Sequence, residues 1–219
     1  MSGGLNNEFM DDPEAFMRKH PVDIPPYDHL KKISPLTKLP DGGGPAAGLQ
    51  EFDLWFDPST GLVNVLLFAD TPGDDKKPEK PLPAFWLPWN PDGEASVTFA
   101  TLNDAGAAYL FTHSLAGCRI LMTETTFTHI SGQLSQKGRQ AMTDELIQGG
   151  RARAFSSTTG NKYGDGAFII GHRAKTGRFF KKRVGAWEFV AQSSEMKFET
   201  KRYAIQKIWD NNDLYLIGQ

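Results

Sequence analysis

The placement of the prolines constrains this chain more than any other sequence feature. All 14 prolines lie between Pro13 and Pro91, and none occurs from Asp92 to the last residue. Proline lacks a backbone donor and interrupts both helices and inner strands. Seven of the prolines lie in residues 13–45, which also contain three consecutive glycines. We therefore expect residues 1–48 to be a Pro/Gly-rich N-terminal arm, with at most a short helix at 13–19, and residues 49–219 to form a single domain.

From residue 49 onward the sequence pattern is mostly typical of strands. Short stretches rich in β-branched and aromatic residues recur between turn-forming residues. They cover 51–56, 62–70, 95–101, 109–113, 119–122, 127–130, 167–172, 179–184, 186–192, 198–208 and 214–217. Helices are expected only at 135–148 and, more briefly, at 103–108. Many strands, few helices and no regular βαβ alternation predict an α+β fold with a mixed β-sandwich core and flanking helices.

Composition excludes several classes of protein. The chain has 24 basic and 26 acidic side chains, so its charge is too near neutral for a nucleic-acid binder to be expected. Apolar runs reach about five residues, far short of the roughly 18 that span a membrane, and we expect no membrane partner. Residues 1–12 show no signal peptide. A single cysteine, Cys118, excludes disulfide frameworks and cysteine-based zinc clusters, which indicates a reducing compartment.

Charge is unevenly distributed along the chain. Residues 1–150 carry 11 basic and 20 acidic side chains, whereas residues 151–219 carry 13 and 6. The basic excess is densest at 172–183, which we interpret as a hairpin with a basic rim. This rim is either a solvated face or a docking surface for an acidic partner. Its docking residues would be Arg178, Lys181, Lys182 and Arg183.

The stretch from Thr112 to His129 is the one that suggests chemistry. A strand at 109–113 leads into Ala116 and Gly117, small residues that permit a tight turn, and Gly117 can adopt a positive φ without penalty. The only thiol, Cys118, follows directly. A cysteine with a pKa of about 8.5 is only slightly ionised at neutral pH and needs a base.

His129 is the candidate base. It follows Cys118 by 11 residues, enough for one strand to run out and the next to return beside it. An imidazolium next to the thiol would then lower its pKa, and Thr112 is near enough in the chain to orient the imidazole. No histidine has partners at metal-ligand spacing, so neither a metal nor another cofactor is expected. The plain alternative is that Cys118 is an inert packing residue.

Thr112, the Leu-Ala-Gly-Cys turn at 115–118 and His129 together resemble the active-site signature of the cytotoxic necrotizing factor-like glutamine deamidases. Within that group the likeness is greatest to compact toxins of the Burkholderia lethal factor type. The bacterial chemoreceptor deamidases share the threonine–cysteine–histidine layout on a related fold. The family has serine where this chain has Ala116. The likeness covers residues 112–129.

The resemblance implies a bacterial, toxin-type hydrolase that converts a glutamine of a host protein to glutamate, with 49–219 as its catalytic domain. It implies Cys118 as nucleophile, His129 as acid and base, Thr112 as the orienting residue, and backbone N–H groups near Ala116 and Gly117 as oxyanion donors. No cofactor is required. Relatives act on Rho-family GTPases or on a DEAD-box helicase of translation initiation. We expect a monomer, made in the bacterial cytoplasm and able to act in host cytosol without a cleaved signal.

Two other interpretations stay open on the residues alone. One is a non-catalytic β-sandwich binding module in which Cys118 only packs. The other is a cysteine peptidase or a transglutaminase, either of which would use the same Cys118–His129 pair.

Overall fold

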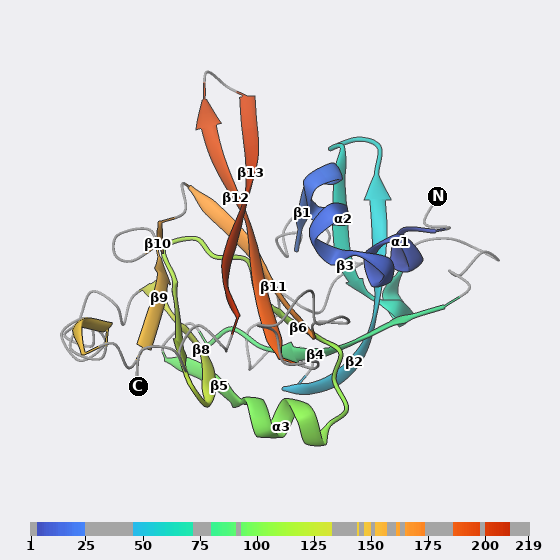
Figure 1. The fold of residues 1–219 in the computed structure, drawn as a ribbon. Helices are drawn as coiled ribbons and strands as arrows, with labels where there is room; N and C mark the ends of the chain where they lie inside the picture. The colour runs from blue at the N-terminus through green and yellow to red at the C-terminus, as the bar shows by residue number, and fades with distance from the viewer. Residues whose placement is uncertain are drawn as a thin grey trace, which may run out of the picture.

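A computed structural model describes a large part of the chain. The described residues are 4–24, 46–71, 80–90, 93–132, 144, 147–149, 152–156, 161–162, 165–173, 186–197 and 200–210. Strands dominate them, with a few short helices between (Figure 1). The prediction of a mixed α+β fold built mostly of sheet is confirmed.

The strands form two sheets. The eight-stranded sheet has the order β1 (Val22–Asp23), β3 (Leu62–Leu67), β2 (Gly48–Asp57), β4 (Leu82–Leu87), β6 (Tyr109–Thr112), β11 (Gly166–Arg173), β12 (Trp187–Lys197) and β13 (Thr200–Asp210). The five-stranded sheet has the order β10 (Asn161–Lys162), β9 (Ala152–Ser156), β7 (Arg119–Thr123), β8 (Thr126–Ile130) and β5 (Glu94–Thr98). Most neighbours are antiparallel, but β4 and β6 run parallel, so the larger sheet is mixed.

One apolar core lies between the two sheets. Both sheets contribute side chains to it: Leu110 and Phe189 belong to the larger sheet, and Ile120 and Phe127 belong to the smaller one. The rings of Phe127 on β8 and Phe189 on β12 stack with centroids 5.0 Å apart and planes 11° from parallel. Alternate residues of a strand face opposite sides, so each sheet contributes one face to this core.

The other face of the larger sheet is covered by the N-terminal residues. Helices α1 (Leu5–Asp11) and α2 (Pro13–Lys19) lie side by side (Figure 1). Helix α1 contacts β2, and helix α2 contacts β13. Phe9 and Phe16 are 1% exposed, and the ring of Phe9 packs against Tyr109 and Phe111 of the sheet. Asp12 caps α2 by accepting a hydrogen bond from Ala15 N, and Pro13 occupies the first helical position, where it needs no donor.

The expectation of a little-structured arm over 1–48 is therefore wrong for residues 4–24. The short helix predicted at 13–19 is present as α2, but α1 and β1 were not expected. Apolar burial outweighs the proline content here, because the prolines lie at helix and strand ends where no donor is lost. The proline- and glycine-rich residues 25–45 lie outside the described part of the chain.

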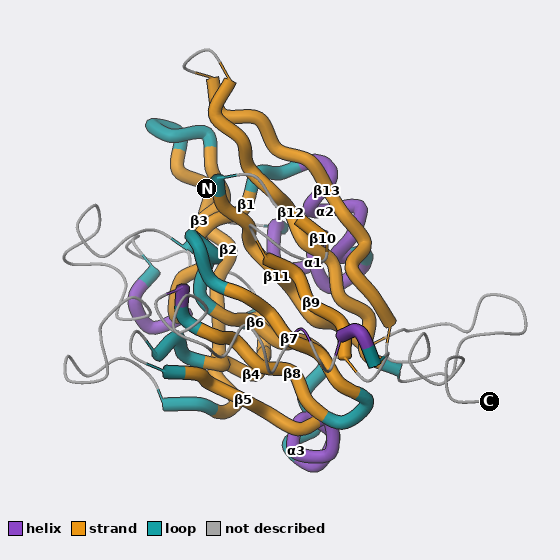
Figure 2. The backbone as a smooth tube through the Cα atoms, turned by 90° about the vertical axis from the view of Figure 1, so that its left-hand side faces the viewer, coloured by secondary structure: helices purple, strands orange, loops and turns teal. Residues whose placement is uncertain are grey.

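Several other elements differ from expectation. Strands β9 and β10 were not predicted, and the strand predicted at 62–70 ends at Leu67, where a short 3-10 helix (Phe68–Asp70) follows. The strand predicted at 95–101 ends at Thr98, whose side chain caps α3 (Phe99–Asp104) by accepting from Thr101 N. This helix, at one end of the smaller sheet (Figure 2), replaces the one predicted at 103–108. Strand β4 was missed because prolines flank and interrupt it. The strands predicted at 179–184 and 214–217, and most of the helix at 135–148, lie outside the described residues.

Gln192 on β12 fastens the N-terminal segment to the larger sheet. Its Oε1 accepts from Val22 N at 2.7 Å, and its Nε2 donates to Met17 O at 2.6 Å and His20 O at 2.8 Å. The side chain is 3% exposed, so three backbone groups depend on one amide in a nearly dry site.

No helix among the described residues is long and apolar enough to cross a membrane.

We expect Gln192→Leu to lower the free energy of unfolding by about 2–4 kcal/mol, because buried backbone groups lose their partner. Urea unfolding measures the loss, and limited proteolysis should cut first within residues 4–24. The exposed Gln148 offers a matched control, since Gln148→Leu removes an amide that is not buried. Equal stability of the two variants would contradict the role assigned to Gln192.

Candidate functional site

The segment from Thr112 to Cys118 connects the two sheets. Thr112 ends β6 in the larger sheet, and Cys118 directly precedes β7 in the smaller one. Between them Leu115 forms an isolated bridge with Ala167, with N–O distances of 2.7 and 3.0 Å. Gly117 has φ +84°, which confirms the expected left-handed turn and explains why glycine is needed there. The turn therefore holds the cysteine at the junction of the sheets.

The strand register brings Cys118 and His129 to one face of the smaller sheet. His129 on β8 lies opposite Ile120 of β7, and Cys118 shares the face of Ile120 because it precedes it by two residues. That face points into the core between the sheets, where Cys118 and Ile120 pack together. Diagonal positions of an antiparallel pair are about 7–8 Å apart, within reach of side chains. The return of the chain as β8 beside β7, expected from the spacing, is confirmed. A contact between the thiol of Cys118 and the imidazole of His129 stays a prediction.

A hydrogen bond fixes the imidazole from the opposite sheet. Thr112 Oγ1 lies 2.7 Å from His129 Nδ1, and both side chains are 1% exposed. The bond joins β6 and β8, two strands from different sheets, across the edge of the core. The predicted contact between Thr112 and His129 is thus confirmed.

His129 is a neutral imidazole in this environment. Burial, helped by the nearby His113, lowers its pKa to about 3. Its Nε2 is buried and has no hydrogen-bond partner among the described residues, so it is not hydrogen-bonded to the cysteine. The imidazolium that sequence reasoning placed beside the thiol is therefore absent in the resting state at neutral pH.

Cys118 is 5% exposed and sits in the apolar core. Burial raises the pKa of its thiol, while hydrogen bonds from the backbone of Gly132 and Ala116 and the nearby indole of Trp89 act in the opposite direction. The thiol is thus protonated at neutral pH but surrounded by donors. Ala116 and Gly117, which directly precede Cys118, are exposed.

Sequence reasoning missed Trp89, His113 and Gly132. Trp89 follows β4, and its ring meets that of His113 at a centroid distance of 5.6 Å. A Cβ on Gly132 would come within 2.9 Å of Gly117 O, so glycine is required where the end of β8 meets the turn. His113 adjoins Thr112 in the sequence and was open to notice. Nothing in the sequence pointed to the other two, because the fold alone brings them to the turn.

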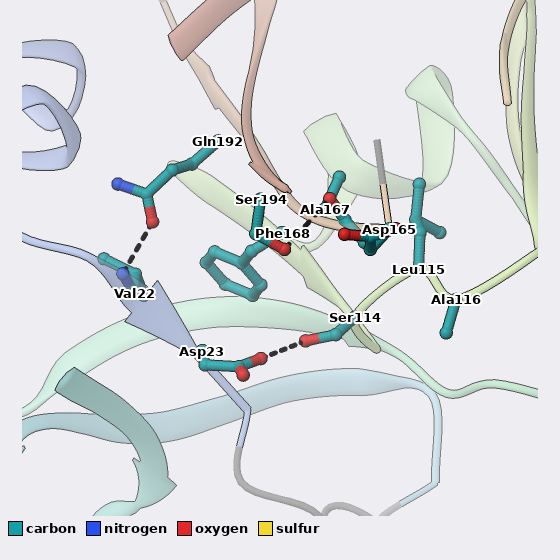
Figure 3. Close-up of a pocket in the computed structure, with 11 residues that line it drawn as sticks. Val22, Asp23, Ser114, Leu115, Ala116, Asp165, Ala167, Phe168, Gln192 and Ser194 are labelled. Carbon is teal, nitrogen blue, oxygen red and sulfur yellow. Dashed lines mark hydrogen bonds between the residues drawn. The ribbon is translucent and has the colours of Figure 1, made fainter. Parts of the chain in front are cut away.

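A cavity of about 200 Å³ lies beside the same turn. Ser114 and Ala116 line it with Asp23 of β1, together with Asp165, which directly precedes β11, and Ser194 of β12 (Figure 3). Ser114 Oγ donates to Asp23 Oδ1 at 2.7 Å. Neither Cys118 nor His129 lines the cavity, so it does not open onto the thiol.

One further expectation concerns docking of a partner. The basic residues Arg178, Lys181, Lys182 and Arg183 lie outside the described residues, and their docking role stays a prediction.

Comparison of the chain with models of protein families and with curated proteins gives no match.

We expect Thr112→Val to lower the free energy of unfolding by about 1–3 kcal/mol, because a buried imidazole nitrogen loses its partner while side-chain shape is kept. Thr112→Ser retains the hydroxyl and should lose less. Urea unfolding of the two variants measures the difference. A valine variant as stable as the serine variant would show that the bond adds nothing.

Stability should fall in acid because of His129. Its pKa in the folded state, about 3, lies below the ordinary 6.5, so between these values only the unfolded chain binds the proton. The free energy of unfolding then declines as pH drops from 6.5 towards 3, by at most about 1.4 kcal/mol per pH unit for each such histidine. The pKa of His113 is lowered by burial as well and adds to the slope.

His129→Asn tests this, since asparagine keeps a polar group near the Nδ1 position but does not titrate. Urea unfolding at several pH values between 4.5 and 7 should give a shallower slope for the variant, with the remainder due to His113. Parallel slopes for the variant and the wild type would contradict a buried neutral imidazole.

Proposed function

We propose that this protein is a cysteine-dependent protein-glutamine deamidase of the cytotoxic necrotizing factor-like type. The observation that carries the proposal is the 2.7 Å contact between Thr112 Oγ1 and His129 Nδ1. This contact joins two residues of the signature that come from different sheets. The register of β7 and β8 places His129 on the face of the smaller sheet that points into the core with Ile120. An inert packing cysteine needs neither an oriented imidazole nor a turn that places it under an exposed backbone.

The chemistry follows from the protonation states. With its proton on Nδ1, His129 donates to Thr112 and keeps a lone pair on Nε2, the nitrogen that has no partner. On contact with substrate, Nε2 takes the proton of Cys118, and the sulfur attacks the carbon of a glutamine carboxamide. The C=O electrons move to oxygen, where backbone N–H groups near Ala116 and Gly117 stabilise them.

Collapse of this intermediate completes the reaction. The C–N bond breaks, the imidazolium of His129 returns its proton to the leaving nitrogen, and ammonia departs from a thioester. Water, deprotonated by the same imidazole, then opens the thioester to glutamate and restores the thiol. General acid–base catalysis of this kind contributes about 10²–10⁴-fold in rate. No step requires a cofactor.

The raised pKa of Cys118 and the lowered pKa of His129 disfavour a preformed thiolate–imidazolium pair, so proton transfer is proposed to accompany attack on the substrate. Such a thiol stays protonated, and therefore weakly nucleophilic, until substrate binds. The substrate is proposed to be a host protein, either a Rho-family GTPase or a translation-initiation DEAD-box helicase, approached as a monomer with the basic residues 178–183 as the docking surface. The enzyme would act in host cytosol after synthesis in the bacterial cytoplasm.

Cys118→Ser should abolish ammonia release and leave folding intact, because a serine hydroxyl is far less acidic than a thiol. The assay incubates a purified Rho-family GTPase or a purified translation-initiation DEAD-box helicase with the protein and measures a gain of about one dalton at a glutamine by mass spectrometry. Ser131→Ala removes a hydroxyl from the neighbouring strand end and serves as the matched control. Unchanged deamidation by the serine variant would remove Cys118 from the mechanism.

The same experiment separates the competing activities. A peptidase cleaves the backbone of the target, and a transglutaminase adds the mass of a primary amine supplied in the buffer. A binding module changes none of these masses. Any of these results in place of the one-dalton gain overturns the deamidase proposal.

A further inference from the structure

We propose that the indole N–H of Trp89 is a third donor around the sulfur of Cys118, beside the backbone N–H groups of Ala116 and Gly132. Together they form an anion hole that stabilises the ionised nucleophile. This inference rests on the proposed function, in which Cys118 attacks the substrate. It assigns a role to Trp89 that the signature residues do not include.

The sheet topology explains how Trp89 reaches the site. Leu87, the last residue of β4, pairs in parallel with Thr112, the last residue of β6. The segments that follow them leave the same edge of the sheet in the same direction. Trp89 and His113 therefore meet, with ring planes 36° apart, and Trp89 packs against the core cluster that contains Cys118.

The indole N–H of Trp89 is buried without an acceptor. Its Nε1 has no hydrogen-bond partner among the described residues, although it lies beside the sulfur of Cys118. A buried tryptophan N–H normally finds a partner, because leaving it unpaired costs free energy. A neutral thiol is a weak acceptor, whereas a thiolate is a strong one. The unsatisfied donor is therefore suited to the charged state of the sulfur.

The backbone donors are held in place by close packing. Gly132 approaches the carbonyl of Gly117 so closely that no side chain fits between them. Leu115 is bridged to Ala167, which anchors the other side of the turn. The three donors thus come from the segment after β4, the turn and the end of β8. Donors fixed in this way need no reorganisation when charge develops.

No described titratable group beside the sulfur is positively charged at pH 7, so none could stabilise a thiolate in place of the three N–H groups. The described titratable groups beside the site are His113 and His129, and burial lowers the pKa of both, so both are neutral at pH 7. The guanidinium of Arg119 points to the opposite face of β7, where Nη1 lies 3.5 Å from Asp144 Oδ1. When the proton passes from Sγ to Nε2 of His129, the negative charge left on sulfur faces the three N–H groups.

The test measures ionisation of the thiol itself. Trp89→Phe keeps an aromatic ring and removes the N–H. Trp86→Phe is the matched control, because Trp86 also has a buried Nε1 without a partner but packs in the other core, against Phe52. Cys118 is the only cysteine, so thiolate absorbance at 240 nm, taken as the difference from Cys118→Ser, reports on one group.

We expect the titration midpoint to rise by about one pH unit in Trp89→Phe, which is about a tenfold fall in the ionised fraction at a given pH. Alkylation by iodoacetamide at fixed pH should slow by a similar factor. Trp86→Phe should leave both values unchanged. A midpoint in Trp89→Phe equal to that of the wild type, or an equal shift in Trp86→Phe, overturns the proposal.

A second variant covers the case in which Trp89→Phe does not fold. Benzothienylalanine at position 89 replaces the N–H by sulfur and keeps the two-ring shape, so it should fold and show the same shift. These readouts need no substrate. If Cys118→Ser still deamidates, the proposed function fails while the effect of Trp89 on the thiol is still measured, so the two failures are distinguishable.

Discussion

The contact between Thr112 and His129 is the constraint on which the site depends. It crosses from one sheet to the other at the edge of their shared core, where both residues are almost entirely removed from water. The hydrogen bond to Thr112 holds the imidazole in one orientation. The same burial keeps it neutral, and this decides how the cysteine beside it can be activated.

Burial therefore keeps the thiol and the imidazole uncharged, whereas other cysteine sites hold a thiolate–imidazolium pair. Removing both groups from water disfavours both charges, since desolvation raises the pKa of a thiol and lowers that of an imidazole. In the proposed mechanism, fixed N–H dipoles around the sulfur and a lone pair on Nε2 of His129 take the place of that ion pair. In the proposed mechanism, the thiol of such a site stays protonated at rest and ionises only when substrate provides the electrophile.

The N-terminal segment takes part in the same construction. Its helices cover the outer face of the larger sheet, Gln192 holds their backbone, and Asp23 accepts a hydrogen bond from Ser114 at the start of the turn. The turn is thereby braced from the N-terminal strand and from β11 at once. Residues that looked like a tail thus support the geometry of the cysteine.

Local sequence predicts much of the fold and part of the candidate site, but not how distant segments pack around the cysteine. Alternating apolar residues and the glycine at 117 determined most strands, the turn and the contact of Thr112 with His129, because these depend on side-chain period and backbone sterics over short distances. The arm was misjudged because proline content says nothing about the apolar surface that Phe9 and Phe16 bury. Only the tertiary structure brought Trp89 and Gly132 to the sulfur and set the charge states of the pair, since parallel pairing of β4 with β6 and desolvation are properties of the packed sheets.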